Sequence, residues 1–323
     1  MTDTGLPDRA PRAPPADLRI AVATVNYCSA DLVMTGLPAL LAELAGFAAH
    51  RVVIVDNASP GDDADRLAAH LATLPGADGV RLVRSPRNGG FAAGNNLAFH
   101  ALAADGFAPD AVLLLNPDAE VRPGAIREMA AVLRTRPHAG VVGARLEHAD
   151  GTSWVAAFHF PSLMGEFARE TGLSWLARRW PVLAPDTDTP ARVDWVSGAA
   201  MLIRSEALAA LGGMDEGYFL YFEEIDFMRA LARRGWETWH APAARVRHLS
   251  GKSTGIVNGR PERGRMPAYW FASWLRYFAK NHGAGYARAA AAAKLAGMLL
   301  GDLQRRLRGK PSGRPERFYR DFA

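Results

Sequence analysis

Short apolar runs alternate with helical patterns along the first third of the chain. The runs over 18–25, 51–55, 80–84 and 111–115 are predicted to be strands, and the last is apolar enough to be buried on both faces of a parallel sheet. Segments with helical periodicity separate them, over 30–47, up to about 74, and over 91–104. Strands that alternate with helices in this way indicate βαβ units, so an α/β fold with a mostly parallel sheet is predicted.

The alternation breaks down after a further predicted strand over 140–146. The segment 150–190 mixes prolines and glycines with Trp154, Trp175 and Trp180, and it is expected to be an irregular insertion or a lid. The remaining predicted elements are a strand over 193–204 and helices over 205–211, over 223–234 and from 266 onward.

A polar turn follows the apolar run 112–115. Pro117 cannot donate to a strand ladder, so Asn116 and Asp118 are expected just past the end of that strand. Three of the four strands end in turns of this kind, and parallel strands bring such turns to one edge, where open α/β sheets bind ligands. An Asx pair there could hold a divalent cation against a diphosphate, because hard cations prefer oxygen ligands. The alternative is a Pro-Asp turn without a ligand.

The composition is that of an ordinary globular protein, with 49% hydrophobic and 22% charged residues. No stretch approaches the roughly 18 apolar residues of a membrane-spanning helix. Residues 1–17 lack the apolar core of a signal peptide and are expected to form a disordered leader. Cys28 is the only cysteine, which excludes an internal disulfide and a cysteine-based metal site and favours a reducing cytoplasm.

The charge is distributed unevenly along the chain. Residues 260–323 hold 14 lysines and arginines but only 4 aspartates and glutamates, whereas acidic residues exceed basic ones in the rest of the chain. An aromatic stripe and the apolar segment 287–300 lie in the same region. The basic tail could therefore lie on an anionic membrane surface, or it could be a helix packed on the body with a solvated basic end.

A glycine-rich loop over 87–96 follows the third predicted strand. It fits neither of the common phosphate-binding glycine patterns. Its backbone N–H groups and asparagine amides would lie at the start of a helix, where anions are favoured. Asn-Gly-Gly is also ordinary turn chemistry, so the loop by itself is weak evidence for a nucleotide site.

Taken in order, the motifs resemble those of the family two inverting glycosyltransferases with the GT-A fold, and among them the bacterial rhamnosyltransferase-like branch. The resemblance extends from about Arg19 to Ser253. The matching segments are 24–27, 55–59, 88–96, 115–118, 195–199, 212–216, 221–226 and 245–248. It implies a Rossmann-like, mostly parallel sheet flanked by helices, followed here by a C-terminal helical extension.

The resemblance also implies roles for individual residues. Asp118 stands at the family's D-x-D motif and would bind Mg²⁺ or Mn²⁺ that bridges the donor diphosphate, with His248 as a further metal ligand. Asn116 replaces the first carboxylate of that motif. The nucleotide sugar would be bound by Thr24, Asn26, Asp56, Asn88, Gly94, Asn95 and Asn116, with Asp56 at the base.

Glu223 and Glu224 stand where the family pattern usually reads Glu-Asp, and the second member would be the general base. The longer side chain of Glu224 departs from the pattern, so Glu224 and Asp226 both remain candidates, with Glu224 ahead. A displacement at an anomeric carbon needs a carboxylate to accept the acceptor proton and a cation to stabilise the leaving diphosphate. Trp195 and Gly198 are expected to contact the acceptor.

Several of these residues have simpler structural interpretations. Asp56 could form an Asx turn with the residues that follow it. His248 could be a surface or hydrogen-bonded histidine, and Glu223 could cap the helix or support Glu224. Trp195 is expected in packing or in the acceptor wall rather than in catalysis.

The expected organisation is a leader over 1–17, a GT-A domain over 18–258 and a basic amphipathic tail over 259–323. The domain would have a nucleotide-binding half over about 18–146 and an acceptor-binding half over about 147–258. The expected function is metal-dependent transfer of a sugar to a cell-envelope saccharide or polyprenyl-linked acceptor, in the cytoplasm or on the inner face of its membrane. For the donor, dTDP-rhamnose is the first hypothesis.

Two other functions are weighed against this one. The first is a sugar-nucleotide-binding or scaffold protein without turnover. The second is nucleic-acid binding through the tail, which ranks low because the body has no helix-turn-helix or zinc motif, and no nucleic-acid partner is expected.

Overall fold

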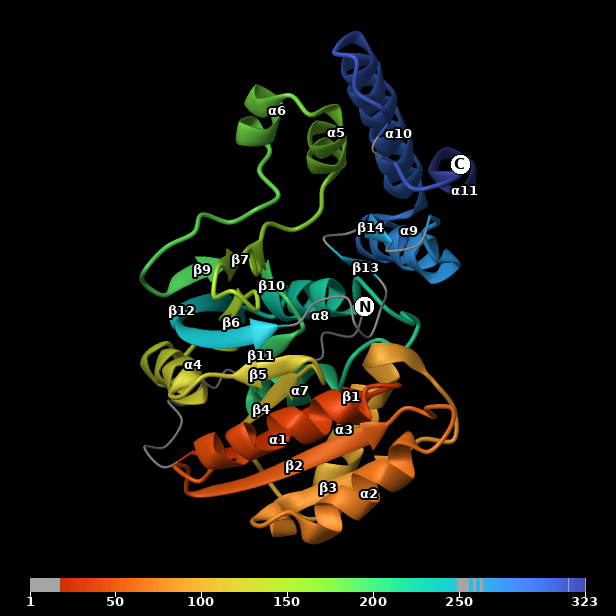
Figure 1. Ribbon diagram of the computed structural model, residues 1–323. Coiled ribbons are helices and arrows are strands. Elements are labelled where there is room, and N and C mark those ends of the chain that lie inside the picture. Colours follow the sequence, from red (N-terminus) through yellow and green to blue (C-terminus); the bar gives the residue numbers. More distant parts are fainter. Residues whose placement is uncertain (1–17, 249–255, 258–259, 262–263, 313, 323) are drawn as a thin grey trace, which may run out of the picture.

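The computed structural model describes residues 18–248, 256–257, 260–261, 264–312 and 314–322 (Figure 1). The predicted leader over 1–17 lies outside these residues. A curled central sheet has helices on both faces, and further helices extend from one end of the molecule (Figure 1). The predicted α/β class and the predicted C-terminal helices are confirmed.

The first half of the sheet contains the four predicted strands, all parallel to one another. Its strand order is β3-β2-β1-β4. The bounds are β1 Arg19–Asn26, β2 Ala49–Asp56, β3 Val80–Arg84 and β4 Ala111–Leu115. Because all four run in the same direction, the polar residues at their carboxyl ends lie along one edge, as predicted.

The second half of the sheet is mixed. Its order continues β11-β6-β12-β5, with β11 antiparallel to both neighbours and β12 parallel to β6. Short strands β7 and β9 pair with β6 and β12. The bounds are β5 Ala119–Val121, β6 Ala139–Glu147, β7 Ser153–Trp154, β9 Ala191–Val193, β11 Ala200–Arg204 and β12 Glu237–His248.

Alternate residues of the strands face two separate cores. Ile20 and Val22 of β1 lie in the core beneath α1 and α4, whereas Ala21 and Ala23 lie in the core beneath α3, α7 and α8. The bounds of the helices in this body are α1 Ala30–Leu44, α2 Asp63–Thr73, the 3₁₀ helix η1 Ala77–Gly79, α3 Gly90–Ala104, α4 Ala125–Thr135, α7 Ser205–Leu211 and α8 Glu223–Ala232. Burial of both faces explains why β4 is entirely apolar.

Two predictions for the middle of the chain are wrong in detail. The predicted irregular insertion over 150–190 contains two helices, α5 Leu163–Thr171 and α6 Ser174–Arg179, and a short strand, β8 Ala157–Phe158. The predicted strand over 193–204 is divided into β9, β10 Trp195–Val196 and β11, because β10 leaves the central sheet to pair with β8.

The C-terminal helices pack on the insertion rather than standing apart from the body. They are α9 Ala268–His282, α10 Ala284–Leu307 and α11 Phe318–Phe322, and a short hairpin of β13 Ile256–Val257 and β14 Arg260–Pro261 precedes them. α10 lies against α5, and Cβ atoms added at Gly297 or Gly301 would overlap the backbone of Phe167 or Glu170. Only glycine at these positions allows the two helices to approach so closely. The predicted division at residue 258 remains a prediction.

Candidate active site

The carboxyl ends of β1 and β2 form a buried polar cluster. Asn26 donates through Nδ2 to Oδ1 of Asp56 at 2.9 Å and to Asp63 at 3.3 Å. Asp56 also accepts a bond from the backbone N–H of Ser59 at 3.2 Å, so the Asx turn weighed as its alternative role is present. Asp56 is 3% exposed, and its contact with a nucleotide base remains a prediction.

The loop after β3 is fixed to β2 by Asn57. This side chain donates to Asn88 Oδ1 and to the carbonyl oxygen of Gly90, both at 3.0 Å. Gly90 has a φ of +83°, and a Cβ there would overlap the carbonyl group of Phe219. The N–H of Phe91 donates to that same carbonyl at 3.0 Å. The start of α3, where a diphosphate is expected, is therefore joined to the loop that precedes α8.

The other residues predicted to contact the nucleotide lie in α3, at the carboxyl end of β1 and directly after β4. Asn95 is 1% exposed and donates to Phe91 O at 2.9 Å, while its Oδ1 has no hydrogen-bond partner among the described residues. Gly94 packs directly on Val25, which accounts for glycine at this position, and its contact with nucleotide remains a prediction. Thr24 is buried, and it lies beside Asn116 in a small apolar crevice next to α1.

Asp118 and His248 face each other across the β5–β12 pair. Ala119 pairs with His248 in the strand register, which brings the Asp118 side chain beside the imidazole. Asp118 Oδ1 and His248 Nε2 lie 3.0 Å apart, and both side chains are nearly inaccessible to solvent. The ring of Trp154 stacks on His248, with 4.9 Å between the ring centroids.

These two side chains provide suitable atoms for a divalent cation. Within the described ranges, His248 Nδ1 has no hydrogen-bond partner, and Asp118 Oδ1 and His248 Nε2 have only their 3.0 Å contact with each other, although all three atoms are buried. Unpartnered buried polar atoms are costly, and a cation between the carboxylate and the imidazole would satisfy them. No group of three or more histidine, cysteine or acidic ligands occurs in the described part of the chain, so the remaining ligands would have to be donor oxygens and water.

The segment 195–199 connects the Asp118 turn with α8. The N–H of Asn116 donates to Ala199 O at 2.9 Å. Gly198 lies between Phe91 and Glu224, since a Cβ added there would be 3.5 Å from the Phe91 ring and 3.7 Å from Glu224 Cβ. The segment therefore brings the start of α3, the Asp118 turn and the start of α8 to one site.

Glu223 and Glu224 begin α8 after an unusual turn. Tyr221 and Phe222 both have positive φ values, +69° and +70°, which non-glycine residues rarely adopt. Strained backbone of this kind is concentrated at functional sites, where the surrounding structure holds it in place. Phe222 is held by packing against Trp270 and Tyr277 of α9.

Burial changes the acidity of both glutamates. Burial raises the pKa of Glu224 to about 7. Burial and the neighbouring Glu224 raise the pKa of Glu223 well above its usual range. Oε2 of each has no hydrogen-bond partner among the described residues. A carboxylate with a pKa near neutrality and no partner is suited to accept a proton.

Asp226 is occupied by other contacts. Its carboxylate accepts bonds from Lys280 Nζ at 2.6 Å and Asn281 Nδ2 at 2.7 Å, both from α9. Lys280 also bonds to Asp215 at 2.6 Å. Asp226 therefore anchors α8 on α9, and this placement favours Glu224 as the base.

An open cavity of about 710 Å³ lies next to Glu224, and it is lined by residues of α5, the start of α8, α9, α10 and the segment after α10. Trp195 and Glu224 line it together. The Trp195 ring stacks on Phe158 at 4.1 Å between centroids, and its indole N–H donates to His159 O at 3.0 Å. The predicted acceptor residue and the predicted base thus face the same space, whose size is typical of a ligand site.

The sequence predictions omitted three residues that shape the site. Asn57 lies within the matching segment 55–59 but has no predicted role, although it holds the glycine-rich loop. Asp63 bonds to Asn26, and Trp154 covers His248. The position of Asn57 directly after Asp56, at the end of a predicted strand, could have indicated its role. The contacts of Asp63 and Trp154 could not be predicted, because they depend on folding that no local pattern reveals.

Comparisons with known proteins agree with this geometry. The family model described as "Glycosyltransferase like family 2" matches residues 15–265. An N-acetylglucosaminyl-diphospho-decaprenol L-rhamnosyltransferase of Mycobacterium tuberculosis is 31% identical over 189 residues, which cover 54% of this chain and 61% of that protein. A low-salt glycan biosynthesis hexosyltransferase of Haloferax volcanii is 26% identical over 208 residues, covering 64% and 60%. The chain thus matches less than two thirds of either relative's length.

Two solved structures share the fold. A mannosyltransferase from Pyrobaculum calidifontis, in complex with GDP-Man and Mn²⁺, has a TM-score of 0.58 at 16% identity, covering 93% of this chain and 78% of that one. GalNAc-T7 with UDP, GalNAc and Mn²⁺ has a TM-score of 0.56 at 14% identity, covering 92% and 55%. At these identities the likeness concerns the fold, which is the GT-A fold expected from the sequence.

Proposed function

The chain belongs to glycosyltransferase family 2, and from this premise we propose that it transfers a sugar from a nucleotide-sugar donor to an acceptor hydroxyl, with inversion at the anomeric carbon. The observation that carries the proposal is the placement of Glu224. Glu224 lines the large cavity, its carboxyl has a pKa of about 7, and it lies beside the segment that contacts the Asp118 turn. The cavity would hold the acceptor, and the donor would lie next to it at the Asp118 turn, which the same segment connects with Glu224.

In the proposed reaction, Glu224 accepts the proton of the acceptor hydroxyl as its oxygen attacks the anomeric carbon. The bond from that carbon to the donor phosphate breaks, and the nucleoside diphosphate leaves with the electron pair. Asp118 and His248 would hold Mg²⁺ or Mn²⁺, which stabilises the charge of the leaving diphosphate when bound. Trp195 would pack on the acceptor sugar, and Asp56, Asn26 and Asn88 would position the nucleotide.

For the donor, dTDP-rhamnose is our first choice, because a relative is named an L-rhamnosyltransferase. For the acceptor we propose a saccharide on a polyprenyl diphosphate, because the same name specifies N-acetylglucosaminyl-diphospho-decaprenol. Such an acceptor resides in a membrane, so we also propose that the protein works in the cytoplasm at the inner membrane surface.

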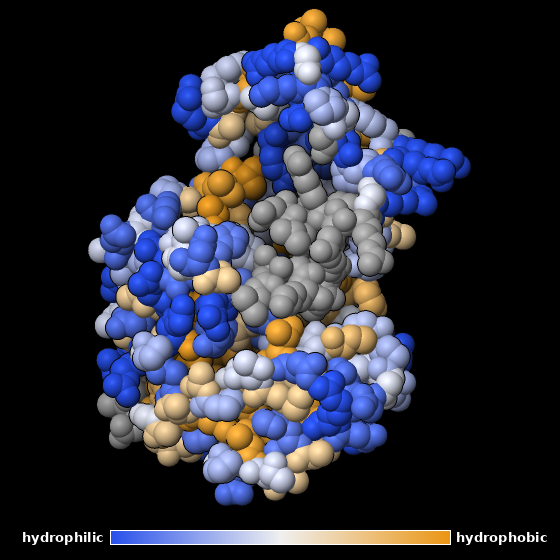
Figure 2. Space-filling model, viewed as in Figure 1, coloured by the Kyte–Doolittle hydropathy of each residue, from blue (hydrophilic) through white to orange (hydrophobic). Residues whose placement is uncertain are grey.

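α10 supplies a surface suited to that contact. In the described ranges, no helix is long and apolar enough to cross a bilayer. Leu299, Leu303 and Leu307 are spaced four residues apart on α10 and are 63%, 53% and 78% exposed. Figure 2 shows hydrophobic residues beside strongly hydrophilic ones at the far end of the helices. An exposed leucine stripe near several arginines is typical of helices that lie on anionic membranes.

The proposed activity is tested by incubating the purified protein with a panel of sugar nucleotides, Mn²⁺ and membrane lipid extract. We expect release of a nucleoside diphosphate from one donor, loss of release when EDTA is added, and recovery with excess Mn²⁺. The absence of release from every donor would contradict the proposal. Donor binding without any product would instead favour a sugar-nucleotide-binding protein without turnover.

A further inference from the structure

The cavity beside Glu224 extends to a group of basic residues that the proposed chemistry does not use. Its lining includes Arg305, Arg308 and Lys310 at the end of α10, in addition to Lys294 of α10 and Arg314 of the segment after it. Cations of this number are more than a neutral sugar requires. The question is which of them already have acidic partners.

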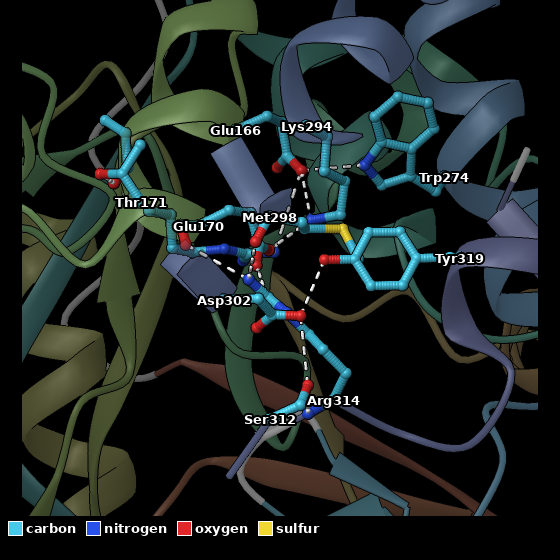
Figure 3. A network of polar contacts seen from close by, with 12 residues as sticks. Glu166, Glu170, Thr171, Trp274, Lys294, Met298, Asp302, Ser312, Arg314 and Tyr319 are labelled. Carbon is cyan, nitrogen blue, oxygen red and sulfur yellow. Dashed lines mark hydrogen bonds and ion pairs between the residues drawn. The ribbon is translucent and has the colours of Figure 1, made fainter. Parts of the chain in front are cut away.

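Lys294 and Arg314 are neutralised within a buried network (Figure 3). Lys294 is 1% exposed, and its Nζ donates to Glu166 at 2.8 Å and to Glu170 at 2.7 Å. Arg314 pairs with Glu170 and, at 3.3 Å, with Asp302. Burial tends to raise the pKa of Glu170, but the attraction of Lys294 and Arg169 outweighs it and lowers this pKa to about 2. Glu170 is therefore ionised at neutral pH, and its ion pairs with these cations hold α5 on α10.

Arg305, Arg308 and Lys310 have no carboxylate partner in the part of the chain that the structure describes. The N–H groups of Arg308 and Lys310 bond back to the carbonyl of Arg305, at 3.1 and 2.9 Å, which folds the three residues into one turn. The Nε of Arg305 donates to Pro311 O at 2.9 Å and fixes its guanidinium. Cations are favoured at any helix C-terminus, but that preference does not require them to face a cavity.

Helix geometry separates this basic turn from the exposed leucines. Gly301, Gln304, Arg305 and Arg308 line the cavity and share one face of α10. At 3.6 residues per turn, Leu303 and Leu307 fall on the opposite face. α10 can therefore contact a membrane with one face and a ligand in the cavity with the other.

We propose that Arg305, Arg308 and Lys310 form a diphosphate-binding subsite for the acceptor, in the same cavity that presents Glu224 and Trp195 to the acceptor sugar. This inference rests on the proposed function. Arginine and lysine are the usual partners of phosphate oxygens, and their bonds to phosphate are charge-assisted. A cavity of about 710 Å³ is large enough for a sugar and a diphosphate together.

The test measures binding of inorganic pyrophosphate to the full chain by calorimetry, with EDTA present so that no divalent cation holds pyrophosphate at the nucleotide site. The double variant Arg308→Ala/Lys310→Ala should bind pyrophosphate roughly tenfold more weakly than the wild type, because charge-assisted bonds are lost. Arg306→Ala is the matched control. Arg306 is an exposed cation in the same helical turn that does not line the cavity, so its removal should leave the affinity unchanged.

A second arm uses vesicles of phosphatidylglycerol and phosphatidylcholine to distinguish a built subsite from general attraction to lipid headgroups. General attraction to headgroups would involve Arg306, Arg308 and Lys310 alike, whereas we expect only Arg308 and Lys310 to affect the binding of pyrophosphate. Equal pyrophosphate affinities in all proteins, or equal losses in the double variant and in Arg306→Ala, would overturn the subsite. Thermal unfolding of each variant checks that it folds.

Failure of donor turnover bears only on the proposed function, because pyrophosphate binding is measured without a donor.

Discussion

At the residue scale, the contacts of Glu224 and Asp226 distinguish the roles of these two carboxylates. Glu224 lines the cavity and has a carboxyl oxygen without a partner among the described residues, whereas Asp226, two residues later, is bound by Lys280 and Asn281. The sequence placed Glu224 ahead of Asp226, but only the fold reveals the contacts of Asp226, since its partners lie more than 50 residues away. The Asx turn at Asp56 could be anticipated because it is local. The hydrogen bond from the N–H of Phe91 to the carbonyl of Phe219 could not be anticipated, because the two residues are far apart in the sequence.

The raised pKa of Glu224 predicts how the rate depends on pH. A general base must be ionised to accept a proton, so kcat/KM should rise with pH on the acid side and level off above about 7. Below that value the rate should fall by about tenfold per pH unit. The profile is measured by nucleoside diphosphate release in buffers of constant ionic strength. An acid limb centred near the ordinary pKa of glutamate, about 4.3, would show that burial of Glu224 does not control the rate.

At the scale of elements, the regular βα units were predictable and the later elements were not. The first four strands follow from apolar runs that end in Asx turns. β12 escaped prediction because a register shift between Ala241 and Arg245 interrupts its alternation, and Pro242 lies within it. α5 and α6 escaped because they are short and are surrounded by prolines and glycines. Their stability comes from packing of α5 on α10, which a local pattern does not encode.

The close contact of α5 with α10 predicts the effect of adding one methyl group. Gly301→Ala should destabilise the protein by about 1–3 kcal/mol, because the new Cβ would overlap the Glu170 carbonyl and force the helices apart. Gly285→Ala on the same helix is the control. Nothing lies within 4 Å of its Cβ position, so the change should be neutral or stabilising by up to about 1 kcal/mol. Urea unfolding measures both, and equal effects would show that the helices are not in close contact.

At the scale of the whole molecule, the insertion and the C-terminal helices together supply most of the residues that line the cavity. α5 lies in the predicted acceptor half and α10 in the predicted tail, yet they share a buried network of charges (Figure 3). The charge asymmetry of the sequence was visible in advance. The separation of the basic residues into cavity-lining and outward-facing groups required the structure, because it depends on how α10 is rotated against α5.

The leucine stripe predicts attachment to anionic membranes. Leu303→Ser/Leu307→Ser should weaken binding to phosphatidylglycerol vesicles by tenfold or more, since burying each leucine contributes about 1.5–3 kcal/mol. Leu275→Ser is the control, because Leu275 is 52% exposed on α9, outside the stripe. Vesicle sedimentation measures the binding, which should also decrease with added salt. Equal binding by both variants would argue against this surface.

In the proposed reaction Glu224 is the base of a sugar transfer, and other residues of the same site, at the Asp118 turn and the start of α3, bind the donor. The most direct measurement is the turnover of Glu224→Gln with its donor affinity determined by calorimetry on the same preparation. We predict that kcat falls by roughly 10²–10⁴, while donor affinity in the presence of Mn²⁺ is unchanged. Turnover close to that of the wild type in Glu224→Gln, with activity lost in Asp226→Asn, would contradict the account and assign the base to Asp226.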